Sequence, residues 1–352
     1  MSTNANTSTA SPSTGSPGLE SSDPGIAGAW RPGTFALRDA WFPVAHSRDI
    51  SAALSLRLVH GQAFCLRRGS DGVFAQHRET DGTQAGLRVP AVERYGYIWV
   101  WYGDRDNADP ALIPDIPFLH PKKAQPAYAT GVAYFDCTYE LLLENILDLT
   151  HIDYIHNVYS GDAEDAEADD VEFMATSESV TMIRTTRKRP TSRYQREVLG
   201  VEAPYQDQSA FTHVLIRSGM CFLHSHYSNA PSMPLMQSNT PESSRLTRAN
   251  FAFGTQQTDN LEFRRQWPGT AAMVAAQDNS VLAPQNPRYV NSPEGADRST
   301  RFDSAGLEFR KRYNALVERQ KRGDFSYLSD AEDGRDIAEI LKVKRIGSGS
   351  RR

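Results

Sequence analysis

The chain has 352 residues, of which 39% are hydrophobic and 10% aromatic, enough to bury the core of one or two domains. Its net charge of −5 gives no support for nucleic-acid binding, and no run of about 18 apolar residues predicts a membrane span. The three cysteines have wide, irregular spacing, which favours a reducing compartment without disulfides, so we expect a cytoplasmic protein.

The N-terminal third predicts a tail, a small β-domain and a linker. Residues 1–29 are rich in Ser, Thr, Gly, Pro and Asn and lack the basic start and apolar stretch of a signal peptide, so they predict a disordered tail. Residues 41–108 predict short strands, with a turn at Gly69–Gly72 and an alternating strand at Tyr97–Tyr102. The Pro-rich residues 109–128 predict a linker.

A second domain is expected over residues 129–325. Alternating apolar and polar residues between 171 and 253 predict a curved antiparallel sheet. Residues 257–282 and 305–322 predict helices, and the Gly/Ser/Arg-rich residues 343–352 predict a flexible tail. The expected fold class is therefore α+β.

The most informative segment, residues 139–159, is Leu-rich, holds no Gly or Pro and predicts a helix. Asn145, Asp148 and His151 recur at i, i+3 and i+6 and share one face. His156 lies about 140° from His151 around an ideal helix, so one ion binds both only near a loosened or ending turn. Two neutral imidazoles and a carboxylate from elsewhere form the facial triad of ferrous oxygenases. Asp148 could orient one imidazole.

A lone pair of histidines is more often an ordinary hydrogen-bonded pair, so the metal-site interpretation depends on the full spacing. The pattern N-x-x-D-x-x-H-x-x-x-x-H, from Asn145 to His156, resembles the mononuclear iron motif of the Rieske-type oxygenases, especially their demethylase and monooxygenase branch. The resemblance implies that His151 and His156 are metal ligands and that Asp278, in the helix expected later, is the third. It also implies a Rieske-like β-domain joined to a helix-grip (START-like) catalytic domain.

The same family carries a [2Fe–2S] cluster on two Cys and two His, arranged as C-x-H and C-x-x-H. No C-x-H occurs among Cys65, Cys137 and Cys221, and the C-x-x-H at Cys221–His224 lies beyond the iron motif with no partner pair. We therefore expect a degenerate β-domain without cluster ligands. This combination resembles a clusterless subgroup, the catalytic subunits of bacterial N7-demethylases that act on 7-methylxanthine in caffeine breakdown.

The resemblance implies an oxygenase component that uses mononuclear Fe(2+) and dioxygen to hydroxylate a small, heteroaromatic substrate. The expected reaction is N-demethylation of a methylxanthine-like molecule with release of formaldehyde. Because the chain has no cluster to store electrons, they are expected from an external Rieske-containing reductase and indirectly from NAD(P)H. In the family, the residue that matches Asp148 bridges a cluster histidine of a neighbouring subunit and an iron ligand, so Asp148 and Asn145 are expected to be catalytic. A homotrimer or a hetero-complex, with an additional small subunit, is expected.

Two further segments invite a functional interpretation. His224 and His226 share one face of a strand, and Phe222, His224 and Tyr227 are expected to bind substrate, because such pockets are mainly aromatic with few polar groups. The acidic residues 161–170 predict a solvated loop. Its alternative role is a docking surface for an electron donor.

Two alternatives come from other protein classes. His151-Ile152-Asp153 spells the H-x-D of 2-oxoglutarate oxygenases, but that motif should close a strand rather than lie in a helical run. A chain without a cluster could also be a non-catalytic scaffold or ligand-binding subunit of an oxygenase complex. Retention of the iron motif argues against this, since unused buried carboxylates and imidazoles cost stability.

Overall fold

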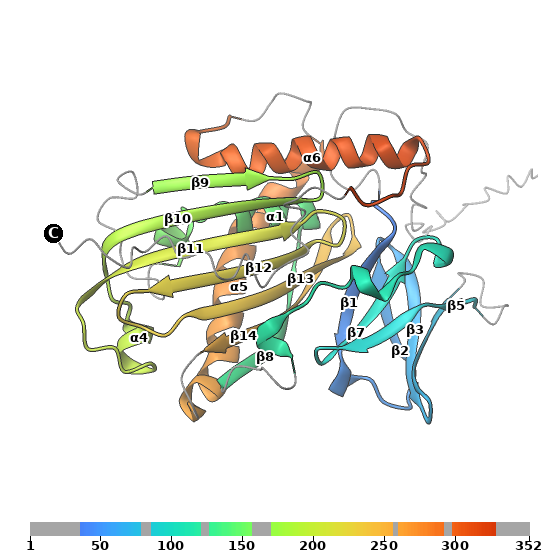
Figure 1. Cartoon of the computed structure of the whole chain (residues 1–352), viewed down its shortest axis with the longest axis horizontal. Coiled ribbons are helices and arrows are strands. Elements are labelled where there is room, and N and C mark those ends of the chain that lie inside the picture. The colour runs from blue at the N-terminus through green and yellow to red at the C-terminus, as the bar shows by residue number, and fades with distance from the viewer. Residues whose placement is uncertain are drawn as a thin grey trace, which may run out of the picture.

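The computed structural model describes residues 36–78, 86–120, 127–156, 170–255, 260–291 and 298–328 (Figure 1). The expected tails at 1–29 and 343–352 and the acidic loop, apart from Asp170, lie outside these ranges. Three antiparallel sheets of three, four and seven strands carry the described fold. Helices cover one face of the largest sheet, which confirms the α+β class.

The N-terminal β-domain consists of two small sheets, ordered β1-β7-β6 and β2-β3-β4-β5. Their strands are β1 Ala40–His46, β2 Ser55–Val59, β3 Gln62–Gly69, β4 Gly72–His77, β5 Arg88–Val89, β6 Ala91–Arg94 and β7 Tyr97–Tyr102. The expected turn at Gly69–Gly72 joins β3 and β4. Two short 3₁₀ turns, Pro110–Leu112 and Pro117–Leu119, lie in the expected linker.

Strand β7 is buried on both faces, because it separates two hydrophobic clusters. Ile98 and Val100 pack into the core of the β-domain. Trp99 and Trp101 point the other way and pack with Phe222 and other residues of the large sheet. The β-domain therefore packs against the large sheet through the tryptophan side chains of β7.

The large sheet has the order β8-β14-β13-β12-β11-β10-β9. Its strands are β8 Ala127–Phe135, β9 Asp170–Ala175, β10 Ser179–Pro190, β11 Tyr205–Leu215, β12 Met220–Tyr227, β13 Met233–Ser243 and β14 Leu246–Thr255. The short helix α4, Arg193–Glu197, joins β10 to β11 and begins with a capping box between Ser192 and Gln195. Because side chains alternate along a strand, this sheet has two distinct faces.

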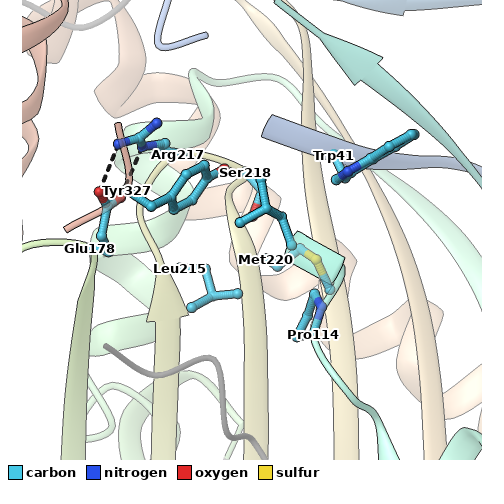
Figure 2. A pocket seen from close by; sticks show the side chains of 9 residues that line it. Trp41, Pro114, Glu178, Leu215, Arg217, Ser218, Met220 and Tyr327 are labelled. Carbon is cyan, nitrogen blue, oxygen red and sulfur yellow. Dashed lines mark hydrogen bonds and ion pairs between the residues drawn. The ribbon is translucent and has the colours of Figure 1, made fainter. Parts of the chain in front are cut away.

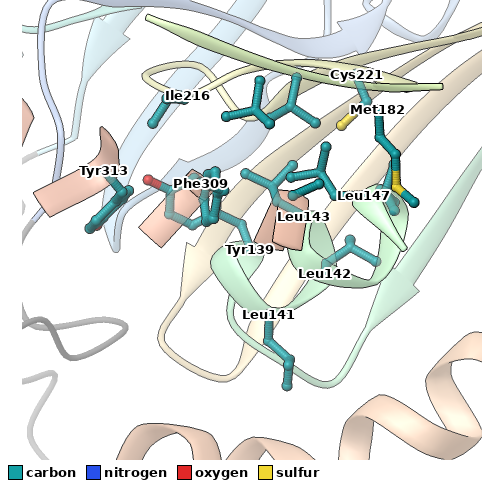
Figure 3. Packing of buried hydrophobic residues seen from close by; sticks show 14 of the residues in the cluster. Tyr139, Leu141, Leu142, Leu143, Leu147, Met182, Ile216, Cys221, Phe309 and Tyr313 are labelled. Atoms are coloured by element: carbon teal, nitrogen blue, oxygen red, sulfur yellow. The ribbon is translucent and has the colours of Figure 1, made fainter. Parts of the chain in front are cut away.

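One face of the large sheet packs against helices α1 Tyr139–Leu147, α5 Leu261–Asn291 and α6 Ser304–Lys321. In Figure 1, α5 crosses behind the strands and α6 runs along the β9 edge. Figure 3 shows Leu143 and Leu147 of α1 beside Met182 of the sheet, with Phe309 of α6 in the same cluster. This core holds the C-terminal end of α1 in place, and His151 and His156 follow shortly after that end.

The helix expected over residues 139–159 is wrong in its length, because α1 ends at Leu147 and a single turn, α2 Ile152–Ile155, follows. The carboxylate of Asp148 accepts a hydrogen bond from the backbone N–H of Thr150 at 2.9 Å. Such a side-chain bond offers the backbone an alternative to the helix. The break places His151 and His156 at the two ends of α2.

Helix α5 is longer than expected, because it continues past residue 282 through Pro284 and Pro287. Proline in a helix removes a backbone hydrogen bond, so other contacts must hold this part. Asn286 is buried and its Oδ1 accepts the backbone N–H of Thr138 at 2.9 Å, and the hydroxyl of Tyr289 donates to Glu144 at 2.5 Å. Contacts with α1 and with its N-cap residue therefore support the continued helix.

A histidine in the β2–β3 turn joins the β-domain to the large sheet. His60 and Gly61 both have positive φ, 48° and 75°, as in a type I′ hairpin turn. Their backbone N–H groups donate to the carbonyl oxygens of Pro241 and Glu242 in β13. The His60 ring contacts Tyr139 of α1 at a centroid distance of 5.4 Å. Burial lowers the pKa of His60 to about 3.

We expect His60→Asn to reduce the acid sensitivity of the fold. The His60 imidazole stays neutral in the folded protein, whereas an unfolded histidine takes up a proton below about pH 6.5. The contribution of His60 therefore lowers the free energy of unfolding of the wild type as the pH falls from 6.5 toward 3. At pH 5 this loss is about 2 kcal/mol. Asn suits the left-handed turn and does not titrate. Urea unfolding at pH 7 and pH 5 measures the difference, and an equal pH 7-to-5 loss in both proteins would contradict the assignment.

Candidate metal centre

Two imidazoles and a carboxylate converge between α2 and α5. The Nε2 atoms of His151 and His156 lie 3.4 and 3.0 Å from Oδ1 of Asp278. The three donor atoms lie within 4.8 Å of one another, and no other group of three such donors occurs in the described part of the chain. His156 and Asp278 are buried and His151 is partly exposed. The structure thus brings together the three residues to which the sequence assigns a metal.

The outward nitrogens of both rings are bound by oxygens that can only accept. Nδ1 of His151 donates to the backbone carbonyl of Asp148, and Nδ1 of His156 donates to Oε1 of Gln277 at 2.9 Å. In a neutral imidazole the proton therefore sits on Nδ1, and the Nε2 lone pair faces Asp278. Two lone pairs and a carboxylate oxygen in contact require a shared proton or a cation between them. This donor set fits a divalent transition metal.

Charges at the centre support one another. Burial by itself would raise the pKa of Asp278, but its hydrogen bonds to His151 and His156 outweigh burial and lower the pKa to about 2. Burial would lower the pKa of His151, but the carboxylate of Asp278 outweighs burial and the pKa of His151 is raised. The carboxylate is therefore an anion at neutral pH that holds positive charge beside it.

Asn145 and Asp148 lie next to the donors. Asn145 donates from Nδ2 to Oδ1 of Asp278 at 3.2 Å. The backbone carbonyl of Asp148, rather than its carboxylate, orients His151, which corrects the expected role of that side chain. Asn145, Asp148 and His151 line a groove of about 890 Å³. Its other walls come from α1, α5, α6 and the segment before α6, including Glu144, Arg288, Tyr289, Arg298 and Arg310.

The three residues expected to bind substrate do not share one wall. Phe222 packs with Trp99 on the face of the sheet that meets the β-domain, and the His224 ring lies 5.7 Å from Phe211 on that same face. Tyr227 is an odd number of residues from both and points to the α5 face, where Gln208 donates to its hydroxyl at 3.5 Å. Strand alternation therefore separates Phe222 and His224 from Tyr227.

The other histidine and aspartate patterns of the sequence have different surroundings. The rings of His224 and His226 lie 4.1 Å apart, but no third donor joins them in the described residues. Asp153, which would be the acid of an H-x-D triad, is instead bound by Arg184 and Arg189. The partner of His151 at the centre is Asp278.

Comparison with known proteins agrees with this arrangement. Residues 135–319, more than half of the chain, match the model of the vanillate O-demethylase oxygenase C-terminal domain. The chain belongs to this family. All three donors of the centre lie inside the matched range. The family is that of Rieske-type oxygenase catalytic domains of the vanillate and dicamba O-demethylase kind.

Individual members of the vanillate O-demethylase oxygenase family match over shorter stretches. The vanillate O-demethylase oxygenase subunit of a Pseudomonas species is 44% identical over 79 residues, and the oxygenase component of dicamba O-demethylase from Stenotrophomonas maltophilia is 45% identical over 109. The chain spans 23% and 31% of the lengths of these relatives.

Solved structures extend the likeness in fold across both parts of the chain. Dicamba monooxygenase bound to dicamba superposes with a TM-score of 0.68 at 18% identity, covering 81% of this chain and 99% of the other. NdmA of Pseudomonas putida, a QL mutant with caffeine, has a TM-score of 0.61 at 18% identity, covering 82% and 93%. In the described residues, no helix combines the length and apolar character needed to cross a membrane.

Gln277 was missed as a functional residue, because its partner His156 is 121 positions away. We expect Gln277→Leu to weaken metal binding by about 10-fold to 100-fold, as is typical when the partner of a ligating histidine is removed. Calorimetric titration with Co(II) measures the affinity. Gln277→Glu keeps a hydrogen-bond acceptor for Nδ1 of His156 and should retain most of the metal affinity. Gln266→Leu, the same change on the exposed side of α5, is the matched control; equal losses in Gln277→Leu and Gln266→Leu would contradict the role.

Proposed function

We propose that the chain is an oxygenase component that demethylates a small aromatic or heteroaromatic substrate at a mononuclear Fe(2+) held by His151, His156 and Asp278. The observation that carries the proposal is the convergence of two Nε2 atoms and one carboxylate oxygen, with both Nδ1 atoms occupied by acceptors. Ferrous iron bound there would supply a centre for the reduction of dioxygen. Family membership and the named activities of the relatives support the same reaction class.

The finer proposal is N-demethylation of a methylxanthine-like substrate, with formaldehyde as the second product. It is supported by the resemblance to the clusterless N7-demethylases and by the similarity in fold to the NdmA QL mutant with caffeine. Tyr227, with Gln208 and Ser225, is proposed to contact the substrate, since these side chains share the sheet face that α5 covers. Phe222 and His224 are not part of this set.

Electrons are proposed to come from a separate Rieske-containing reductase that uses NAD(P)H. The chain has three cysteines and no C-x-H, and the three cysteines are buried free thiols. Asn145 and Asp148 line the groove beside His151, which is the proposed approach for the donor. We also propose that residues 41–108 and 129–325 are two domains joined by residues 109–128, and that subunits assemble as a trimer or with the reductase and a small subunit.

Metal content, optical spectrum and product analysis test the proposal together. The purified protein is reconstituted anaerobically with Fe(2+), and formaldehyde is then measured with a Rieske-containing reductase, NADH and either methylxanthines or methoxybenzoates. About one iron per chain, no [2Fe–2S] absorption and formaldehyde from one substrate class would support the proposal and choose the class. Absence of iron after reconstitution would favour the non-catalytic scaffold.

Asp148→Asn is expected to retain iron and to lose most coupled turnover. Asn can still accept the backbone N–H of Thr150, so the break after α1 should persist, but the carboxylate that faces the groove is lost. The measurement is formaldehyde formed per NADH consumed, beside iron content. Asp303→Asn, which changes another carboxylate of the groove, is the control. Normal coupling in Asp148→Asn would contradict the role, and weaker iron binding would instead mean that the carboxylate mainly supports the turn before His151 through Thr150.

A further inference from the structure

Asp153 belongs to α2, between His151 and His156 in the sequence, and both of its carboxylate oxygens are bound by arginines. Oδ2 accepts from Arg184 and Oδ1 accepts from Arg189. The three side chains are at most 4% exposed. Arg184 also donates from Nη1 to the carbonyl oxygen of Leu149 at 2.9 Å. Two side chains of β10 therefore hold the turn that carries both histidines.

Arg189 reaches this face of the sheet only because β10 contains a bulge. Arg184 and Arg189 are five residues apart, an odd number, so strict alternation would put them on opposite faces. Thr186 pairs with Gln208 and Arg189 pairs with Gln206, so two residues of β10 oppose one of β11. The extra residue turns Arg189 toward the same face as Arg184.

The bulge is held by an acid on the neighbouring strand. The two bulged residues are Arg187 and Lys188, and Lys188 has φ of +50°, a conformation uncommon for a residue with a Cβ. Asp207, opposite them, accepts the backbone N–H of Lys188 at 2.9 Å and Nη1 of Arg187 at 3.0 Å. Asp207 thereby stabilises a strained backbone conformation.

We infer that Asp153, held by Arg184 and Arg189, is a positioning residue for the metal centre. The inference rests on the proposed function, because it assumes that His151 and His156 bind the metal. Both histidines flank α2, a helix of four residues that cannot be stable by itself. The ion pairs fix the middle of this turn to the rigid sheet, and so fix the distance between the two Nε2 atoms. Neither arginine nor Asp153 belongs to the N-x-x-D-x-x-H-x-x-x-x-H pattern.

The test must separate positioning from stability, because Asp153→Asn leaves two buried guanidinium groups without their anion. The charge-free variant Asp153→Asn/Arg184→Gln/Arg189→Gln removes that penalty. Both variants and the wild type are titrated with Co(II), whose visible absorption reports ligand number and geometry, and are melted. We expect both variants to lose about 10-fold to 100-fold in Co(II) affinity with an altered spectrum. The charge-free variant should regain melting temperature without regaining affinity.

Glu178→Gln is the matched control. Glu178, next to the beginning of β10, is also buried between two arginines. Figure 2 shows its ion pair with Arg217, at 2.7 Å, and the second arginine, Arg319, lies 3.7 Å away. Arg189 lies near the other end of that strand. Glu178→Gln should lower the melting temperature and leave Co(II) affinity and spectrum unchanged.

The outcomes distinguish this inference from the proposed function. If wild type binds no Co(II), the metal site itself fails. If wild type binds Co(II) and the folded variants bind it equally with the same spectrum, positioning by Asp153 is overturned and the metal site stands. If both variants of Asp153 fail to fold, Asp207→Ala is the deciding variant. It removes the side chain that holds the bulge, and because Asp207 is only half-buried, this variant should still fold. A loss of several-fold in affinity supports the inference, and wild-type affinity overturns it.

Discussion

Asp278→Ala is expected to abolish specific binding of ferrous iron, with a loss in affinity of more than about 100-fold. Removal of a partner that only supports a ligand already costs about 10-fold to 100-fold, and Asp278 is the one anion among the three donors. Iron content after anaerobic reconstitution and Co(II) titration measure the loss. Turnover should fall to background in the same variant.

The apo-protein gives an independent readout of the same residue. Because the carboxylate of Asp278 raises the pKa of His151, the variant should titrate this imidazole at lower pH than wild type in an NMR titration. Glu262→Ala is the control, since Glu262 is an exposed acid at the start of the same helix. If Asp278→Ala binds as much iron as Glu262→Ala, Asp278 is not a ligand of the metal.

The metal centre could be predicted where its residues lie close together in sequence. Asn145, Asp148 and His151 line one groove, although the helix whose face their spacing predicts them to share ends at Leu147. The required loosening before His156 exists as the break after Leu147. Its cause, the bond from Thr150 to Asp148, is local, but Ser, Thr and Asp make such bonds in many loops, so the pattern by itself does not place the break.

Contacts between distant segments could not be predicted in the same way. Gln277 and Arg189 reach α2 from other elements, and one of them depends on a bulge that shifts a whole strand register. The residues expected to bind substrate, Phe222, His224 and Tyr227, are divided between two faces of β12 for a simpler reason, since a strand alternates its faces. The end of α5 was misplaced because buried contacts of Asn286 outweigh two prolines.

The same distinction applies to the β-domain, whose outline could be predicted and whose attachment could not. Alternation along β7 predicts one buried face, yet both faces are buried. Trp99 is fully buried in a cluster that also contains Phe211 and Phe222 of the large sheet and linker residues such as Ile116. Its indole N–H donates to the carbonyl oxygen of Arg94 at 3.0 Å. The β-domain thus covers an apolar face of the large sheet, opposite the face that packs against the helices.

Trp99→Ala is therefore expected to lower the free energy of unfolding by about 3–5 kcal/mol, as for other large aromatic residues removed from a core. Because the cluster spans both parts of the chain, we expect one cooperative transition in urea by fluorescence and circular dichroism, shifted as a whole. Leu56→Ala, at a side chain that is 45% exposed in the same β-domain, should change stability by less than about 0.5 kcal/mol.

Two separate transitions, with only the first shifted by Trp99→Ala, would mean that the β-domain folds by itself and does not stabilise the sheet. A single transition would give a physical reason for the β-domain to persist in a sequence that has no C-x-H. Without the tryptophans of the β-domain, Phe211, Phe222 and Met236 would be exposed as an apolar patch, which soluble domains avoid. The β-domain then contributes to stability as the cover of an apolar face of the large sheet, whatever its role in electron transfer.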